Sequence, residues 1–477
     1  MDFLGIELFL DDEMISYTRN MRRELHQARK YEHNPIITNE YPWEGTHVTL
    51  YGSVLADESR GVLRMWYNAY GEKYYEQQTL AYAESEDGIH WDKPMMDYVS
   101  WEGYKKTNIL MGPDPNLHGP CVILNPDQTD PSRRFLLLFD SYARYHPEVA
   151  DNPAAWRACY AAESPDGFRW SPPQGRLAFA GKADSGQCVV WEPLAGKFRA
   201  YARNHSKDIN GSCNRIFRLV ESTDFIHWET PTELFRPDEL DGEPDRQLQQ
   251  IAVTRFDGLY VGLLGLFRRS QCFRDSPTHI HEGDQLDEIQ LITSRDGVRF
   301  TRVADRAVFL PKSQPPQWGT GGQRMASQMV LHKDKVLVYY GSRGQDASGV
   351  LDKPLQIGLA TIPRDQFVSM VPNQLLETGM LELRPLVYRG GSLYLNTTVL
   401  AGGSVCAELT DFEGTPIEGF DRDNAIAIEE DGLDQPVRWK AGDRSVSLNE
   451  LGSGHRFQPL RLRLWIHHAH VHALRER

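Results

Sequence analysis

Short segments rich in branched and aromatic residues follow one another along most of the chain, each bounded by Gly, Asp or Pro. Between residues 47 and 361 these segments come in groups of three, for example HVTLYGSVLAD, VLRMWYNAY and TLAYAES. Such a composition, with turn residues at the ends, is typical of β-strands. The pattern therefore predicts an all-β chain.

Each group of predicted strands ends in a similar turn sequence. The copies are AESEDGIHW, AESPDGFRW, VESTDFIHW and ITSRDGVRF, with a weaker fifth copy in LATIPRDQF. Their aspartates stand at positions 87, 166, 224, 296 and 365. Three strands, the turn and a short fourth strand that begins at the aromatic residue make a four-stranded unit. Five such units predict a five-bladed β-propeller.

The repeated turn has a structural explanation. Asp-Gly suits a tight turn because Gly adopts positive φ and the Asp side chain binds backbone amides. The Ser binds amides of the same loop, and the aromatic residue is expected to pack between blades. Residues that recur at every blade cannot all lie at one central active site. We therefore interpret Asp87, Asp166, Asp224 and Asp296 as structural residues.

The C-terminal part shows strand patterns without the repeat, in SLYLNTTV, SVCAELTD, PVRWKAG and LRLRLWIHHAHVHALRER. Short strands over roughly 90 residues predict a small C-terminal β-sandwich. The predicted domains are a propeller over residues 1–385 and a β-sandwich over residues 386–477. A strand-like segment before the first blade, GIELFLDDEMI, is expected to complete the last blade and close the ring.

Composition narrows the class of protein. The chain has 477 residues, is 40% hydrophobic and 25% charged, and is typical of a folded globular protein. Its net charge of -14 argues against a nucleic-acid partner, which usually requires a basic face. The six cysteines lack metal-site or disulfide spacing and are expected to be free thiols. Without a signal-peptide pattern or a membrane-length apolar run, we expect a cytoplasmic protein with no membrane partner.

The chain resembles a known superfamily at LFLDD, NPII, PWEG, GVLRMWYNAYG, the Ser-x-Asp-Gly turns and LQIGLATIPRDQFVSM. It is similar to the five-bladed β-propeller glycoside hydrolases. In that group invertases, levanases and inulinases add a C-terminal β-sandwich, while arabinanases, xylosidases and mannoside phosphorylases share the propeller. The resemblance implies a carbohydrate substrate and no cofactor. The Asn-Asp-Pro-Asn-Gly, Arg-Asp-Pro and Glu-Cys motifs of invertases are absent from the corresponding places, so no catalytic residue is transferred.

Candidate catalytic residues come from the predicted start of each inner strand, where a propeller lines one mouth of its central funnel. Glycoside hydrolysis needs a carboxylic acid and a carboxylate that acts as base or nucleophile. Asp184 is the strongest candidate because it directly precedes a clear inner strand, where the middle-blade aspartate of the superfamily falls. Glu243 or Asp245 is the candidate acid, and Glu44 is a candidate nucleophile or base.

Other residues at the strand starts are expected to bind substrate, namely His47, His118, Trp318, Gln323 and Arg324. The Trp318 indole offers a flat face for a sugar ring. Arg324 and Arg246 offer guanidinium groups for a charged sugar or a phosphate. His468, His470 and His472 alternate on one predicted strand, but no acid is placed to complete a site. We therefore predict no metal.

Three functions stay open on the sequence. The first is a glycoside hydrolase, expected to be exo-acting because the funnel should be closed at one end. The second is a phosphate-dependent glycoside phosphorylase, in which basic residues bind phosphate. The third is a carbohydrate-binding propeller without catalysis. An assembly of several copies of the chain is compatible with all three.

Overall fold

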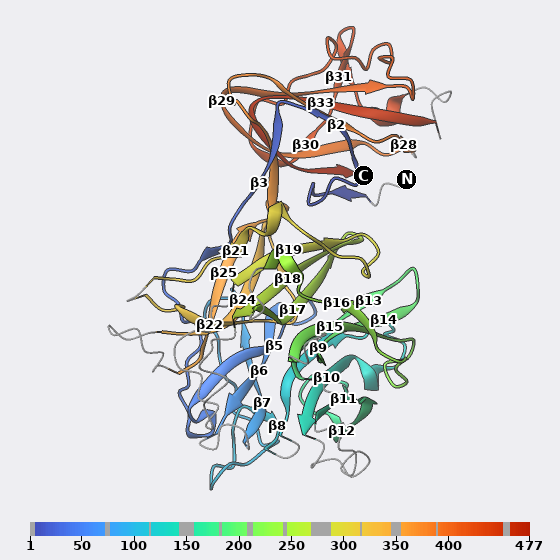
Figure 1. Cartoon of the computed structure of the whole chain (residues 1–477). Coiled ribbons are helices and arrows are strands. Elements are labelled where there is room, and N and C mark those ends of the chain that lie inside the picture. The colour runs from blue at the N-terminus through green and yellow to red at the C-terminus, as the bar shows by residue number, and fades with distance from the viewer. Residues whose placement is uncertain are drawn as a thin grey trace.

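The computed structural model describes residues 5–71, 77–113, 116–142, 157–180, 184–207, 213–241, 246–268, 288–314, 317–344, 354–387, 390–451 and 458–477. Side chains are described for the same residues except 184–185, 205–207, 213–214, 246 and 267–268. The strands form a five-bladed β-propeller and an additional sheet built from terminal strands (Figure 1). The all-β prediction and the number of blades are confirmed.

Each of the first three blades is a four-stranded antiparallel sheet. Blade 1 contains β5 (His47–Asp57), β6 (Val62–Tyr70), β7 (Gln78–Ser85) and β8 (Ile109–Met111). Blade 2 contains β9 (His118–Leu124), β10 (Phe135–Tyr142), β11 (Arg157–Ser164) and β12 (Ser171–Phe179). Blade 3 contains β13 (Asp184–Glu192), β14 (Lys197–Lys207), β15 (Cys213–Ser222) and β16 (Thr232–Phe235).

Blades 4 and 5 have a divided strand each. Blade 4 contains β17 (Arg246–Phe256), β18 (Leu259–Arg268), β19 (Glu288–Ser294), β20 (Thr301–Arg302) and β21 (Val308–Leu310). Blade 5 contains β22 (Gly321–Met325), β23 (Val330–His332), β24 (Lys335–Arg343), β25 (Gln356–Pro363) and β4 (Arg29–Lys30). Single 3-10 turns occupy Pro42–Glu44, Pro131–Arg133, Glu239–Asp241, Ala304–Arg306 and Leu448–Glu450.

An N-terminal strand closes the ring, but it is not the strand that the sequence pattern suggests. β4 pairs with β25 through Lys30 and Ala360 and so supplies the outer strand of blade 5. The GIELFLDD segment instead contains β1 (Ile6–Glu7), which pairs with the C-terminal strand β33 (Pro459–Glu476). Both segments read as short strands, and local pattern does not say which sheet edge a strand joins.

The repeated turn has the structure that its residues predict. Ser85 Oγ accepts a hydrogen bond from the Gly88 amide at 2.8 Å. Asp87 Oδ1 accepts from the amides of residues 89 and 90, both at 2.8 Å. Gly88, Gly167 and Gly297 all have positive φ, and Phe225 adopts φ +66° at the same position of the third copy. In blade 1, however, the fourth strand begins at Ile109 and not at Trp91, because a hairpin through residues 96–107 intervenes.

Each of these turns also contacts the preceding blade. Trp66 of blade 1 donates a hydrogen bond from Nε1 to the Gly167 carbonyl of the blade 2 turn at 2.8 Å. Tyr201 of blade 3 donates to the Gly297 carbonyl at 2.8 Å, and Tyr339 of blade 5 donates to the Gly88 carbonyl at 2.9 Å. The turns therefore tie neighbouring blades together, in agreement with a structural role.

The second part of the molecule is a nine-stranded sheet. Its main strands are β2 (Ile15–Arg19), β3 (Met21–Leu25), β26 (Val368–Pro372), β27 (Gly379–Leu383), β29 (Leu393–Thr410) and β33. β1, β28 (Leu386–Val387) and β30 (Gly432–Pro436) complete it, and a hairpin of β31 (Trp439–Ala441) and β32 (Arg444–Val446) lies outside it. β29 and β33 are 18 residues long and pair along most of their length. We call this part the terminal sheet.

The domain boundary predicted at residue 385 does not match this topology. Strands at residues 6–25 and 368–383 pair within the terminal sheet and not within the propeller. The predicted sandwich is thus one sheet that recruits strands from both ends of the propeller sequence. Residues 368–383 continue from blade 5 with an unchanged strand pattern, so the local sequence does not mark the transition.

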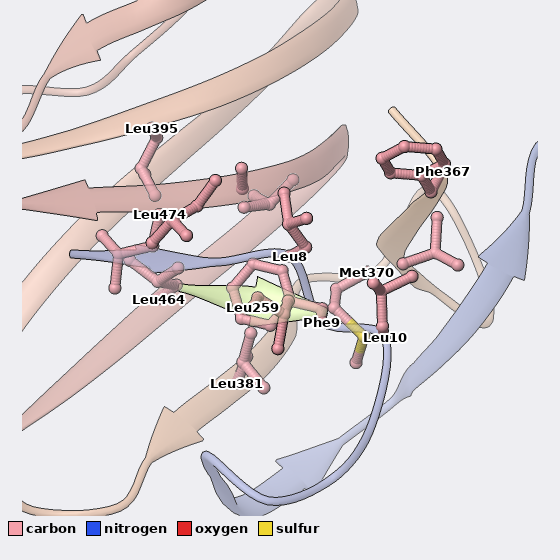
Figure 2. Packing of buried hydrophobic residues seen from close by; sticks show 14 of the residues in the cluster. Leu8, Phe9, Leu10, Leu259, Phe367, Met370, Leu381, Leu395, Leu464 and Leu474 are labelled. Atoms are coloured by element: carbon pink, nitrogen blue, oxygen red, sulfur yellow. The ribbon is translucent and has the colours of Figure 1, made fainter. Parts of the chain in front are cut away.

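One hydrophobic core joins the terminal sheet to blades 4 and 5. Its buried residues include Leu259 and Phe309 of blade 4, Tyr340 of blade 5 and Leu464 of β33. Figure 2 shows Leu8, Phe9 and Leu10 lying among residues of the terminal sheet and Leu259. Among the residues described, no helix is long and apolar enough to span a membrane.

The docked turns should make some glycines far more sensitive than others. A Cβ atom at Gly167, where φ is +77°, would lie 2.8 Å from both Arg64 Nη2 and Trp66 Cζ2. At Gly196, where φ is +62°, nothing lies within 4 Å. Gly196→Ala should cost about 1–2 kcal/mol of unfolding free energy through backbone strain alone. Gly167→Ala should cost about 1–3 kcal/mol more through overpacking, as measured by urea denaturation. Equal losses in the two variants would contradict the proposed docking of the turn.

Candidate functional site

The five inner strands β5, β9, β13, β17 and β22 begin at one mouth of the propeller, which we call the front mouth. Tyr51 of β5 stands at its centre. The Tyr51 ring lies 5.1 Å from the His118 ring of blade 2, and the Arg324 guanidinium of blade 5 lies 5.8 Å from its centroid. Gln249 of blade 4 donates a hydrogen bond to the Tyr51 hydroxyl at 3.1 Å. Residues from three other blades therefore converge on this side chain.

A buried carboxylate lies beside this centre. Asp140, at the end of β10, is 0% exposed and lies 2.5 Å from Arg157 Nη2. His118 Nδ1 lies 3.3 Å from Asp140 Oδ1, and Gln187 of blade 3 donates to the same oxygen at 3.2 Å. A buried carboxylate requires such partners because desolvation penalises its charge. Asp140 thus links blades 2 and 3 at the front mouth.

Gly119 allows this close arrangement. Its φ is +60°, and a Cβ atom there would lie 2.9 Å from Gln187 Oε1 and 3.1 Å from Asp140 Oδ1. A larger residue would combine backbone strain with a clash against both polar groups. The glycine lets the inner strand of blade 2 approach the carboxylate closely.

Guanidinium groups gather around Gln249. Arg203 donates to the Gln249 carbonyl at 2.7 Å, and Arg215 donates to its side-chain oxygen. With Arg157 and Arg324, these residues give the front mouth four described arginines from blades 2, 3 and 5. Planar guanidinium groups are well suited to bind oxyanions.

Hydrogen-bonded polar side chains join neighbouring inner strands behind the front mouth. The Ser53 and Ser327 hydroxyls lie 2.6 Å apart, and Ser53 accepts from the Val122 amide at 2.8 Å. Gln250 binds both the amide and the carbonyl of Met325. All of these side chains are buried. We call this buried polar layer the floor of the front mouth funnel.

A pocket of about 360 Å³ lies at the opposite, rear mouth, where the inner strands end. It is lined by Val54, Leu55, Ala56, Ile123, Leu124, Val189, Val190, Trp191, Val253, Thr254, Arg255, Gln328, Met329, Val330 and Leu331. Arg255 is the one charged residue in this lining, and no carboxylate contributes to it. The described residues of this lining therefore do not supply the carboxylic acids that glycoside chemistry requires.

Several predicted site residues lie at the front mouth. His118 and Arg324 contact the Tyr51 ring, as described above. Gln323 is buried, donates to the Pro311 carbonyl at 3.3 Å, and its Oε1 has no hydrogen-bond partner within the described part of the chain. His47 begins β5, and burial together with the nearby Arg343 lowers its pKa to about 4, so the ring is neutral at pH 7.

The predicted catalytic acids can be placed only in part. Asp184 is the first residue of β13, and its backbone pairs with that of Arg203 at the front mouth. The Asp184 side chain and residues Glu243 and Asp245 lie outside the described residues. Glu243 and Asp245 directly precede β17, whose Gln249 reaches Tyr51. Their catalytic roles stay predictions.

Glu44 has the contacts of a structural carboxylate. It is 0% exposed, and it accepts from the Tyr67 hydroxyl at 2.7 Å and from the amide of residue 40 at 2.8 Å. Lys93 lies 2.9 Å away. With these partners Glu44 ties the 3-10 turn to blade 1, and the contacts favour this role over catalysis.

Trp318 likewise has the contacts of a packing residue. Its ring lies 5.6 Å from that of Tyr340, and a Cβ atom at Gly358 would lie only 2.4 Å from Trp318 Cζ3. These contacts hold the indole against the strands of blade 5, so they favour packing over a sugar platform.

Sequence reasoning missed Tyr51, Asp140, Arg157, Gln187 and Gln249. Tyr51, Gln187 and Gln249 lie several residues inside the inner strands, beyond the strand starts that the sequence singled out. Asp140 and Arg157 lie on the second and third strands of blade 2, which reach the same mouth because the strands are antiparallel. A signal was present in FLLLFDSY, where an aspartate interrupts an apolar strand. Among the described residues, no group of three His, Cys, Asp or Glu side chains is arranged to hold a metal ion.

Solved structures with a similar course of the chain include three carbohydrate-related proteins. An N-acetylgalactosamine deacetylase from F. plautii, in complex with blood group B trisaccharide, is 15% identical with a TM-score of 0.48, over 72% of this chain and 96% of that chain. A glycosyl hydrolase from Bacteroides ovatus is 18% identical with a TM-score of 0.46, over 71% and 94%. A β-1,2-mannobiose phosphorylase from Listeria innocua is 13% identical with a TM-score of 0.46, over 71% and 97%.

Neither a family model nor a curated protein matches the chain. The three structures carry three different activities, so their likeness does not select one for this chain.

The buried ion pair at the front mouth should be important for stability. Asp140→Ala removes the anion that faces the buried Arg157 guanidinium, and breaking such a pair costs about 3–5 kcal/mol. The matched control is Glu233→Ala, which breaks the exposed pair with Arg236 and should cost less than about 1 kcal/mol. Urea denaturation of both variants measures the difference. A loss at Asp140 no larger than that at Glu233 would contradict the assigned pairing.

Proposed function

We propose that the chain is a glycoside hydrolase that cleaves an oligosaccharide or glycoside at the front mouth. The observation that carries the proposal is the convergence of Asp140, His118, Gln187 and Gln249 around Tyr51. These polar groups come from the strand ends of different blades. Asp184 and the acidic segment before β17 lead into the same strand ends, which supports a site with more than one carboxylate.

In this proposal the carboxylates divide the reaction between them. Glu243 or Asp245 donates a proton to the glycosidic oxygen as the bond to the anomeric carbon breaks. Asp184 either attacks the anomeric carbon or takes a proton from the attacking water. Asp140 is fully buried and engaged with Arg157, so we assign it a positioning role: it orients His118 and Gln187 beneath the substrate. Retention or inversion depends on the separation of the two reacting carboxyl groups.

The floor of the funnel supports exo-action. Ser53, Ser327 and Gln250 are buried and hydrogen-bonded between neighbouring blades, and we infer that this layer stops a polysaccharide chain from passing through the ring. A substrate would enter by one end, and the enzyme would remove terminal residues. Tyr51 and Gln249 would then contact the terminal sugar.

A phosphate-dependent phosphorylase is the second candidate, and the arginines at the front mouth favour it. Arg157, Arg203, Arg215 and Arg324 could orient inorganic phosphate so that its oxygen attacks the anomeric carbon in place of water. One protein carboxylic acid would still protonate the leaving oxygen. The two reactions differ in the product, which is a free sugar for the hydrolase and a sugar phosphate for the phosphorylase.

The test is product analysis with a panel of oligosaccharides and aryl glycosides in phosphate-free buffer. The wild-type protein should release a free terminal sugar, and Asp184→Asn should lower kcat by about 10²–10⁴-fold. The matched control is Asp224→Asn, the same substitution on the same blade but in the structural turn. It should leave kcat within a few-fold of the wild-type value.

The alternatives give distinct results in this assay. Turnover that appears only with phosphate and yields a sugar phosphate identifies the phosphorylase. Saccharide binding without any product, with or without phosphate, identifies a binding propeller. An active Asp184→Asn variant with an inactive Asp245→Asn or Glu243→Gln variant would reassign the roles.

A further inference from the structure

Three histidine rings meet where the terminal sheet joins the propeller. We call this region the neck; it comprises the chain crossings at residues 26–28 and 364–368 together with β33 beside them (Figure 1). The His26 ring lies 5.4 Å from that of His472 and 6.4 Å from that of His470. The rings of His470 and His472 lie 6.2 Å apart. The centroids of three titratable rings thus lie 5.4–6.4 Å from one another.

Two hydroxyl groups and one carbonyl hold the rings. Ser369 Oγ of β26 lies 3.0 Å from His26 Nε2 and 3.1 Å from His470 Nδ1. His472 Nδ1 lies 3.3 Å from the Val368 carbonyl, to which it must donate, and its Nε2 lies 3.0 Å from Thr398 Oγ1. A neutral His472 satisfies both contacts, because its Nε2 then accepts from the threonine hydroxyl.

The three rings therefore connect four strands of the terminal sheet at the neck. His26 follows β3, Ser369 and Val368 lie in β26, His470 and His472 lie in β33, and Thr398 lies in β29. β26 pairs with β3 from Val368 to Pro372 but meets β33 at Met370 and Val471. The Ser369–His470 and Val368–His472 contacts add to this single described backbone pairing between β26 and β33.

Other charged groups face the rings from these elements. β3 contributes Arg22 and Glu24, β33 contributes His468, and Asp431 precedes β30. β26 has no titratable residue. Burial lowers the pKa of His26 and of His470, and burial together with His26 lowers the pKa of His472 to about 4. Glu24 and Asp431 act in the opposite direction but do not reverse the shift.

We propose that the histidine cluster makes the neck an acid-sensitive joint. Protonation of the rings places like charges about 6 Å apart around the buried His472, and it changes the hydrogen-bonding role of His472 Nε2 from acceptor to donor. When β3 and β26 separate from β33, water reaches the charged rings. The neck is closed at neutral pH, and it is the first part of the molecule to open as the pH falls.

The direction of the pH effect on neck opening follows from the lowered pKa values of the histidines. The opened neck exposes histidines of ordinary pKa near 6.5, whereas the closed neck holds His472 with a pKa of about 4. The opened state therefore binds more protons between these values, so the closed state is fully favoured above pH 6.5 and is weakened on the way to pH 4. For His472 alone the opening equilibrium should rise by about 30-fold between pH 7.5 and pH 5.

Native-state hydrogen exchange of the whole chain, followed by mass spectrometry at pH 7.5 and pH 5, tests the proposal. After correction for intrinsic exchange, peptides from residues 21–27, 366–372 and 466–474 should lose at least tenfold protection. Peptides from β10 and β11 in blade 2 should keep theirs. This measurement needs no variant, so it does not depend on whether a substituted neck folds.

Variants assign the effect to the cluster. His26→Gln and His472→Gln remove a titratable ring and should reduce the acid-dependent loss of protection at the neck severalfold. The matched controls are His90→Gln and His227→Gln in the exposed turns of blades 1 and 3, which should retain the full wild-type response. The proposal is overturned by unchanged neck protection at pH 5, by equal loss in blade 2, or by neck variants that respond like the wild type.

Discussion

The structure depends on the pairing of two residues near the N-terminus with the last blade. Lys30 and Arg29 pair with Ala360 and Thr361, so a strand from before blade 1 completes blade 5. An open row of five sheets would leave exposed edges and no common axis. Once the ring is closed, the inner strands of all blades must begin at the same mouth. The front mouth is therefore a consequence of closure, and its residues can come from anywhere in the sequence.

Side-chain amides extend this closure to the centre of the ring. Asn68 of blade 1 donates to the Leu117 carbonyl and accepts from the Gly119 amide, both at 2.9 Å, so it acts like a peptide group between blades 1 and 2. Gln250 likewise donates to the Met325 carbonyl and accepts from the Met325 amide between blades 4 and 5. These bonds satisfy buried backbone groups that no neighbouring strand reaches. They also form the floor that separates the polar front mouth from the apolar rear mouth.

The contrast between repeated and unrepeated residues explains what the sequence could predict. The turn residues Ser85, Asp87 and Gly88 recur because each blade needs the same local geometry, so blade number and their structural role followed from the pattern. Asp140 has no counterpart in the repeat, and its position depends on His118 and Gln187 from other strands. Glu44 illustrates the reverse case. Its position next to an inner strand predicts a catalytic carboxylate, whereas its contacts with Tyr67 and Lys93 favour a structural role.

The local sequence pattern also could not predict which sheet each strand joins. Residues 368–383 read as further propeller strands, yet they join β33 because the shared core of Phe367, Met370 and Leu381 lies on the terminal sheet side. The ion pairs reinforce this arrangement. Arg475 of β33 binds Asp365, the aspartate of the fifth turn, at 2.8 Å and Asp257 of blade 4 at 2.5 Å.

The fifth turn thus contacts the terminal sheet, whereas the other turns contact a neighbouring blade. Arg295, in the blade 4 turn, similarly binds Glu7 and Asp11 from the N-terminal segment. The terminal sheet is therefore anchored to the rear side of blades 4 and 5. These two blades contribute Gln249 and Arg324 to the front mouth. The described ion pairs of the terminal sheet therefore reach the blades that carry Gln249 and Arg324, and not blade 2, which carries Asp140 and His118.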